Sequence, residues 1–406
     1  MNQELMRDYA RLIAAVGAKV QKGEEVWIYA DLDQPEFVYM LTEECYKLGA
    51  KEVEVRFNHE RLAVLDYKYM TLGNLSKVSP MTITRFKYMA KKLPTTIYLE
   101  SSDPDGLKGI DQVKMAKSMA KRYPKIKKYR DIADGKYKWC IAGVPGKAWA
   151  KKVFPNETEE VALEKLWDAI LMTSRVDGND PVENWNKHNA FLIGQRNKLN
   201  NLDLRKLIYK SSNGTDFEVE LIPHISWGAG VETAPNKGEF NPNIPTEEVF
   251  TSPYRGRCEG TLVASKPLSY QGQLIEDFSI TFKEGKVSSV KAKKNQKLLE
   301  KMVSMDEGAA MLGEVALVPY TSPINMSGIL FFNTLYDENA CCHVALGHGF
   351  KELLDVNLSS EEAKEKGIND SMIHVDFMVG TKDLNIVGID AKGVKYQIFK
   401  DGEWAI

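Results

Sequence analysis

A histidine and an aspartate stand two residues apart in an otherwise apolar stretch, SMIHVDFMVG at residues 371–380. Successive side chains of a β-strand point to opposite faces, so His374 and Asp376 would share one face. The apolar side chains at 373, 375, 377 and 379 would then share the other face. An unpaired carboxylate is costly to bury in such a strand. A divalent cation would remove that cost, and so would a hydrogen-bonded His–Asp pair in the core, so both interpretations stay open.

Further carboxylates and another histidine lie beside apolar segments in the same half of the chain. Glu314 is in LGEVALVP, Glu338 and His343 are in DENACCHVALGHGF, and Glu247 and Glu248 are in NIPTEEVFTSP. Each has an ordinary structural explanation as a paired carboxylate, a turn residue or a solvated strand end. Together they form a set of nitrogen and oxygen donors without thiolate, which suits Zn²⁺, Co²⁺ or Mn²⁺.

Two of the four other histidines compete for a functional role. His224 lies near a turn in LIPHISWGAG, and His348 follows His343 by five residues, which would put the two on opposite faces of a strand. We rank both below the histidines already named as metal ligands. His59 and His188 are interpreted as structural.

The elements that must position these residues fall into two regions. Up to about residue 180, buried strands at 24–30, 95–101 and 138–145 are separated by segments with helical periodicity. This β-α-β order is typical of a parallel sheet. Beyond residue 205, Ser-Asn-Gly-Thr at 212–215 and Glu-Gly at 284–285 each separate two strand-like runs and predict hairpins.

The sequence therefore predicts an α/β N-terminal domain with a parallel sheet at residues 1–186, followed by a β-rich α+β catalytic domain at residues 187–406. The boundary is placed in a helical connector near residue 186.

Composition narrows the functional classes. The chain has 406 residues, a formal net charge of −2, 43% hydrophobic and 27% charged residues, which gives no electrostatic reason to expect nucleic acid or an anionic membrane as partner. We find no secretory signal and no apolar run of the roughly 18 residues that a membrane helix needs. A Gly-rich phosphate loop is also missing, which argues against a nucleotide-binding module.

Cysteine usage indicates the compartment. The five cysteines are odd in number and include no CxxC motif, so they do not form a disulfide framework. A reducing cytoplasm is expected.

Four ordered motifs resemble the M29 metallopeptidases, the family of thermophilic-type aminopeptidases. They are NIPTEEVFTSP, GEVALV, ENACCHVALG and HVDFMVGT, and KWCIAGVPGKAWAKKVFP in the first region is similar as well. The resemblance covers the whole chain. It implies two divalent metal ions per subunit, Zn, Co or Mn, and a homodimer that hydrolyses short peptides with a free N-terminus. The ligand set that it implies is Glu248, Glu314, His343, His374 and Asp376, with Glu338 as a further candidate and Glu247 as the alternative to Glu248.

The expected activity is that of a metal-dependent aminopeptidase. Glu314 is expected to act as general base, as bridging ligand or as both, and His348 and Phe350 are candidates for the substrate pocket. Phe350 departs from the family pattern, since some relatives carry a tyrosine there. The alternative is therefore a catalytically impaired peptide- or metal-binding protein on the same scaffold.

Overall fold

The computed structural model describes residues 2–355 and 357–406. The chain forms two compact units, Met1–Asn186 with Val231–Ile244, and Lys187–Gly230 with Pro245–Ile406. Helix α9 (Pro181–Leu202) contains the point at which the chain passes from the first unit to the second.

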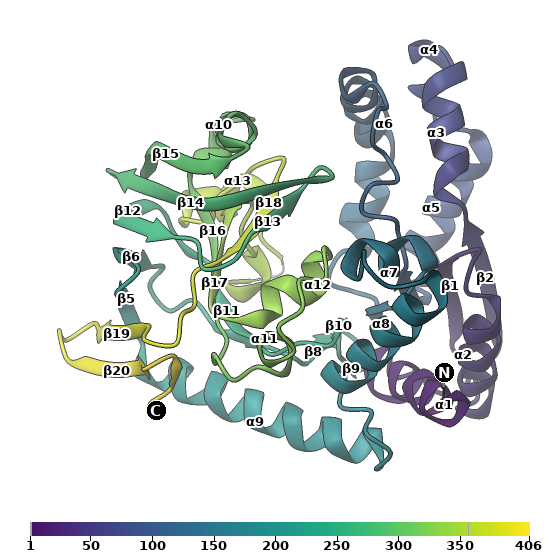
Figure 1. The fold of residues 1–406 in the computed structure, drawn as a ribbon, viewed down its shortest axis with the longest axis horizontal. Helices are drawn as coiled ribbons and strands as arrows, with labels where there is room; N and C mark the ends of the chain where they lie inside the picture. Colours follow the sequence, from purple (N-terminus) through teal and green to yellow (C-terminus); the bar gives the residue numbers. More distant parts are fainter. Residues whose placement is uncertain (1, 356) are drawn as a thin grey trace. The chain divides into compact units, whose positions relative to one another are not determined.

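The first unit contains a five-stranded parallel sheet in the order β10-β4-β3-β1-β2. Figure 1 labels β1, β2 and β10 of this sheet. Its strands are β1 (Glu25–Asp31), β2 (Glu52–Asn58), β3 (Thr95–Glu100), β4 (Trp139–Gly143) and β10 (Asn243–Ile244). A short antiparallel pair, β8 (Glu232–Ala234) and β9 (Gly238–Phe240), belongs to the same unit. The predicted parallel α/β sheet is therefore confirmed.

Two helices of the first unit have residues that typically begin or end a helix. Asp111 caps α6 by accepting a hydrogen bond from the backbone N–H of Lys114. Pro35 occupies the first turn of α2, and Gly49, with φ of +90°, follows its end. The helices are α1 (Gln3–Leu12) with the π-turn η1 (Ile13–Gly17), α2 (Pro35–Lys47), α3 (Glu60–Tyr69), α4 (Leu72–Leu75), α5 (Pro80–Lys92), α6 (Gln112–Ala133), α7 (Lys147–Val153) and α8 (Glu159–Thr173).

The second unit is built from two antiparallel sheets. The larger has nine strands in the order β13-β14-β12-β6-β5-β19-β20-β21, with β15 paired to β14, and the smaller has five in the order β18-β17-β16-β11-β7. Both predicted hairpins are present, β5 with β6 and β14 with β15. Glu284 and Gly285 have φ of +52° and +76°, as a tight hairpin turn requires. A β-rich second region is therefore also confirmed.

The remaining bounds of this unit are as follows. The larger sheet contains β5 (Leu204–Lys210), β6 (Asp216–Leu221), β12 (Pro253–Val263), β13 (Leu268–Tyr270), β14 (Gln273–Lys283), β15 (Lys286–Lys294), β19 (Asn385–Asp390), β20 (Lys395–Lys400) and β21 (Glu403–Trp404). The smaller sheet contains β7 (Gly228–Ala229), β11 (Val249–Thr251), β16 (Leu312–Leu317), β17 (His343–Gly347) and β18 (His374–Met378). The helical segments are α10 (Gln296–Val303), η2 (Gly308–Ala310), α11 (Pro323–Met326), α12 (Thr334–Asp337), η3 (Glu338–Ala340), η4 (Lys351–Leu353) and α13 (Ser360–Glu365).

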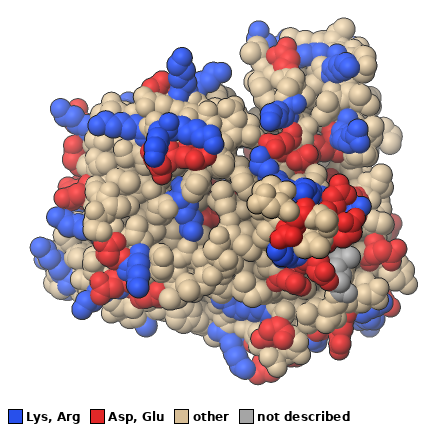
Figure 2. Space-filling model, viewed as in Figure 1, with Lys and Arg blue, Asp and Glu red and all other residues tan. Residues whose placement is uncertain are grey.

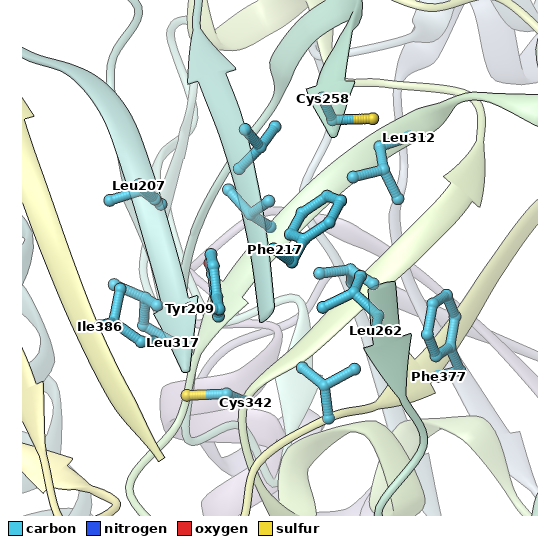
Figure 3. Close-up of a cluster of buried hydrophobic side chains, with 14 of the residues drawn as sticks. Leu207, Tyr209, Phe217, Cys258, Leu262, Leu312, Leu317, Cys342, Phe377 and Ile386 are labelled. Atoms are coloured by element: carbon cyan, nitrogen blue, oxygen red, sulfur yellow. The ribbon is translucent and has the colours of Figure 1, made fainter. Parts of the chain in front are cut away.

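Side chains from both sheets form the core of the second unit (Figure 3). Phe377 on β18 packs against Phe278 on β14, with ring centroids 5.7 Å apart. Val379 lies in the same core, and Ile373 and Val375 pack against it. The predicted apolar face of residues 373–379 is therefore confirmed, and the opposite face of β18 is free for polar side chains.

The charged side chains on the surface and the state of the cysteines agree with what the sequence predicts. Basic and acidic side chains are interspersed over the face of the molecule seen in Figure 2. All five cysteines are buried with free thiols. Every helix among the described residues is too short or too polar to cross a membrane.

Candidate metal centre

Three neighbouring strands of the smaller sheet present the predicted residues. Glu314 on β16 pairs in register with Ala345 on β17, and Ala345 pairs with Asp376 on β18. Directly paired residues of an antiparallel sheet point to the same face, so the two carboxylates lie on either side of a small methyl group. Alanine at the central position leaves room for both carboxylates above it.

The histidines begin their strands on the same face. His343 is the first residue of β17 and His374 the first residue of β18. His343 is two residues before Ala345, and His374 is two before Asp376, so strand alternation puts all of them on one side of the sheet. Glu248 comes immediately before β11 and joins them from an irregular segment.

These side chains form two groups that share one carboxylate. Glu248, Glu314 and His343 offer ligand atoms within 4.8 Å of one another, and so do Glu314, His374 and Asp376. His343 Nε2 lies 3.1 Å from Glu248 Oε2, and His374 Nε2 lies 3.1 Å from Glu314 Oε2. Glu314 is therefore the one carboxylate that belongs to both groups.

Backbone carbonyls orient both imidazoles. The Nδ1 atom of His343 is 3.3 Å from the carbonyl oxygen of Cys341, and that of His374 is 2.7 Å from the carbonyl oxygen of His348. A proton on each Nδ1 would donate to these carbonyls and leave Nε2 facing the carboxylates. This is the usual arrangement of histidines that bind a metal.

The buried charge of the cluster is unbalanced. Burial raises the pKa of Glu314 to about 7, although the hydrogen bond with His374 works against the shift. Burial also raises the pKa of Glu338 well above its ordinary value, and the neighbouring carboxylates of Asp376, Glu248 and Glu314 raise it further.

The imidazoles respond in the opposite sense. Burial alone would lower the pKa of His343, but the hydrogen-bonded Glu248 and the other carboxylates outweigh it and raise this pKa to about 9. The pKa of His374 is raised for the same reason, mainly by Asp376. In this arrangement protons are the counter-charge of the carboxylates.

The donor set fits a divalent cation. Asp376 Oδ1 is buried and forms no hydrogen bond with a described residue, although His374 Nε2 is 3.4 Å away. Four carboxylates face two imidazoles, and divalent cations would reduce this excess of negative charge and could coordinate the Asp376 oxygen. Imidazole and carboxylate donors suit Zn²⁺, Co²⁺ or Mn²⁺.

The structure separates the two adjacent glutamates. Glu248 faces His343, whereas Glu247 turns towards His188, with 3.7 Å between Glu247 Oε2 and His188 Nε2. His188 Nε2 also lies 2.7 Å from the carbonyl oxygen of Thr246. His188 thus supports the segment that carries Glu248, a contact with no local sequence signal because His188 is 58 residues from Thr246.

The remaining predicted residues surround the cluster. Glu338 lies in η3 and belongs to neither three-residue group. Phe350 packs against His374 with ring centroids 5.2 Å apart. The side chain of His348 is half exposed and pairs with Asp370, and its backbone carbonyl contacts His374. His224 is exposed and pairs with Asp203.

Comparisons with known proteins identify the family of this chain. The model of the thermophilic metalloprotease (M29) family matches residues 2–404. The chain belongs to this family. It is 38% identical to aminopeptidase AmpS of Bacillus subtilis, over 98% of each chain, and 37% identical to aminopeptidase 2 of Geobacillus stearothermophilus, over 98% of this chain and 97% of the relative. The solved structure of wild-type AmpT from Thermus thermophilus superposes with a TM-score of 0.91 at 32% identity, over the whole of both chains.

The resemblance drawn from the four sequence motifs is thereby confirmed, and so is the fold class. As a member of this family the protein is a metallopeptidase.

Proposed function

We propose that this metallopeptidase is an aminopeptidase that removes the N-terminal residue of short peptides with two divalent ions, Zn, Co or Mn. The observation that carries the proposal is the pair of three-residue ligand groups that share Glu314. The similarity to relatives named aminopeptidases supports the exopeptidase activity. The proposed ligands are Glu248, Glu314, His343, His374 and Asp376, with Glu338 as a further candidate.

Two bound ions would lower the pKa of water and polarise the scissile carbonyl. Glu314 is the proposed general base, which takes a proton from the attacking water and delivers it to the leaving amine.

We further propose a cytoplasmic homodimer with an α/β domain at residues 1–186 and a catalytic domain at residues 187–406, from which residues 231–244 join the α/β unit. Five free, buried thiols are consistent with a reducing compartment. Support for self-association comes from large apolar side chains on the helices of the first unit, such as Tyr69 and Met81, which are 72% and 82% exposed. Light scattering at micromolar concentration tests the dimer, and a monomer would contradict it.

The activity is tested with chelator-stripped protein and leucine p-nitroanilide, with and without Co²⁺, Zn²⁺ or Mn²⁺. An N-acetylated substrate is the control. We expect metal-restored cleavage of the free-amine substrate alone. Cleavage of both substrates would contradict an aminopeptidase.

Phe350 supports a second candidate, an impaired binding protein on the same scaffold. Its ring contacts His374 and carries no hydroxyl that could donate to a developing oxyanion. Bound metal without cleavage of leucine p-nitroanilide or of a small peptide panel would favour this candidate.

A further inference from the structure

Two candidate ligands lie outside the strand ladder that fixes the others. Glu248 is in the irregular segment 245–248, and Glu338 is in the short 3₁₀ turn η3. The hydrogen bonds between strands hold the backbone of Glu314, His343, His374 and Asp376. The positions of Glu248 and Glu338 therefore depend on other contacts.

One amide side chain connects these two segments. Asn339 is completely buried, and its Oδ1 accepts a hydrogen bond of 2.8 Å from the backbone N–H of Glu247. Its Nδ2 donates to the carbonyl of Leu335 at 3.0 Å and to Glu338 Oε1 at 3.4 Å. The backbone carbonyl of Asn339 accepts from Ser322 Oγ at 2.7 Å, which fastens η3 itself.

The contact with Glu247 sets the direction of two side chains. Asn339 fixes the N–H of Glu247, and His188 lies against the carbonyl oxygen of Thr246, the preceding residue. With the backbone held on both sides, Glu247 turns to His188 and Glu248 turns to His343. Both glutamates precede β11, so the register of a strand does not set this choice.

We propose that Asn339 is a positioning residue of the metal centre, which aims Glu248 through the backbone of Glu247 and holds the Glu338 carboxylate by its amide. Groups that orient metal ligands typically contribute about 10- to 100-fold to metal affinity. An amide suits this place because it accepts from the backbone and donates to a carboxylate, and adds no charge to a cluster that already contains four carboxylates. The inference rests on the proposed metal centre.

The test measures metal affinity rather than turnover. Zn²⁺ is titrated into chelator-stripped wild type and Asn339→Ala in competition with a chromogenic chelator. We expect the variant to bind about 10- to 100-fold more weakly. Asn339→Ser, whose shorter side chain keeps one polar group but withdraws it from the Glu247 N–H, provides the measurement should the alanine variant not fold.

Thr215→Val is the matched control for lost stability. Thr215 is also buried, and its Oγ1 also accepts a backbone N–H from a distant segment, that of Val263 at 3.1 Å, but in the turn between β5 and β6. We expect its metal affinity to stay within twofold of wild type. Equal weakening by Thr215→Val and Asn339→Ala would mean general destabilisation and would overturn the inference.

A double-mutant cycle with Glu338→Gln separates positioning from mere packing. If Asn339 acts partly through Glu338, Asn339→Ala will weaken binding less in the Glu338→Gln background than in wild type. Equal effects of Asn339→Ala in both backgrounds would show that Asn339 does not act through Glu338. A metal affinity of Asn339→Ala within twofold of wild type would refute the whole inference. If the wild type itself binds no metal, the proposed function is overturned together with the inference. The wild type is titrated first, so this outcome is distinguished from an effect of the variants.

Discussion

Both units bury ionised groups, but they neutralise them differently. In the first unit Lys138 has no exposed side-chain surface, and its Nζ lies 2.9 Å from Glu24 Oε2. Thr95 Oγ1 donates a further hydrogen bond of 3.1 Å to the same carboxylate. Burial lowers the pKa of Lys138, and the neighbouring Glu24 carboxylate opposes this shift. The charge of Lys138 is therefore paired within the protein.

The carboxylate cluster of the second unit is different. Among the described residues, the carboxylates of Glu248, Glu314, Glu338 and Asp376 face the imidazoles of two histidines, and burial raises the pKa of Glu338 well above its ordinary value. An isolated buried charge is expensive whereas a paired one is tolerated. The difference between the units indicates that Lys138 is part of a structural pair, and that the carboxylate cluster is built for a charge from outside the chain.

Glu314→Gln is expected to have the largest effect. The variant keeps the size of the side chain but loses the proton-accepting carboxylate, so kcat should fall by about 10²- to 10⁴-fold. The protein should still fold, since the change removes one of several crowded negative charges. Steady-state kinetics and thermal melting measure the two effects, and activity at the wild-type level would exclude Glu314 as the base.

Lys138→Met should be the most damaging to stability. It leaves Glu24 buried without its cation, which costs about 3–5 kcal/mol of unfolding free energy. Metal affinity should stay within twofold of wild type, since the pair serves structure alone. Urea denaturation of this variant and of Lys138→Met with Glu24→Gln checks the cause, because the double variant should regain part of the loss. A double variant as unstable as the single one would contradict the role of Glu24.

The stabilisation by metal should depend on pH. The raised pKa values of Glu314, about 7, and His343, about 9, mean that protons bind the folded, metal-free site more tightly than the unfolded chain. Each contribution is complete below the group's ordinary pKa and is lost as pH rises through the raised value. Metal-free protein should therefore lose stability between about pH 5 and 9, by this linkage.

Bound metal replaces these protons, so the metal-loaded protein should lose less stability than the metal-free protein as the pH rises. Zn²⁺ at about 100 times its Kd should add about 2.7 kcal/mol, and the gain in Tm should be larger at pH 8.5 than at pH 6, where protons compete for the ligands. Differential scanning fluorimetry at fixed free Zn²⁺ makes the comparison. A larger gain at pH 6 would contradict protons as the counter-charge of the free site.

Phe350→Leu should have the smallest effect. The aromatic contact of Phe350 with the imidazole of His374 is worth about 0.5–1.5 kcal/mol. Metal affinity should therefore fall by about 2- to 10-fold, while the same residues remain the ligands. A chelator competition titration measures this. Unchanged affinity would show that the carbonyl of His348 orients His374 without help from the ring.

Local patterns predicted the parts of the site that local geometry decides. His374 and Asp376 share a face because a strand repeats every two residues, and that period is visible in the sequence. The parallel strands of the first unit were recognisable from buried runs separated by helical segments. The hairpins were recognisable from their turn residues.

Long-range contacts decide what could not be predicted. The segment 245–248 has no regular period, so the sequence alone could not distinguish Glu247 from Glu248. Asn339 and His188 approach that segment from 92 and 58 residues away. Strand β10 likewise pairs with β4 across about a hundred residues, without a periodic signal in its two residues. The carbonyl of His348 contacts His374 through the backbone, which residue types do not reveal.

The central claim is that an external charge completes the carboxylate cluster, and native mass spectrometry counts that charge directly. The protein would be stripped with chelator, exchanged into a volatile buffer and titrated with Zn²⁺, with Lys138→Met and Glu314→Gln beside the wild type. We expect two ions per chain in the wild type and in Lys138→Met, and fewer in Glu314→Gln. A wild-type chain that binds no ion, or one ion only, would contradict the two-metal centre.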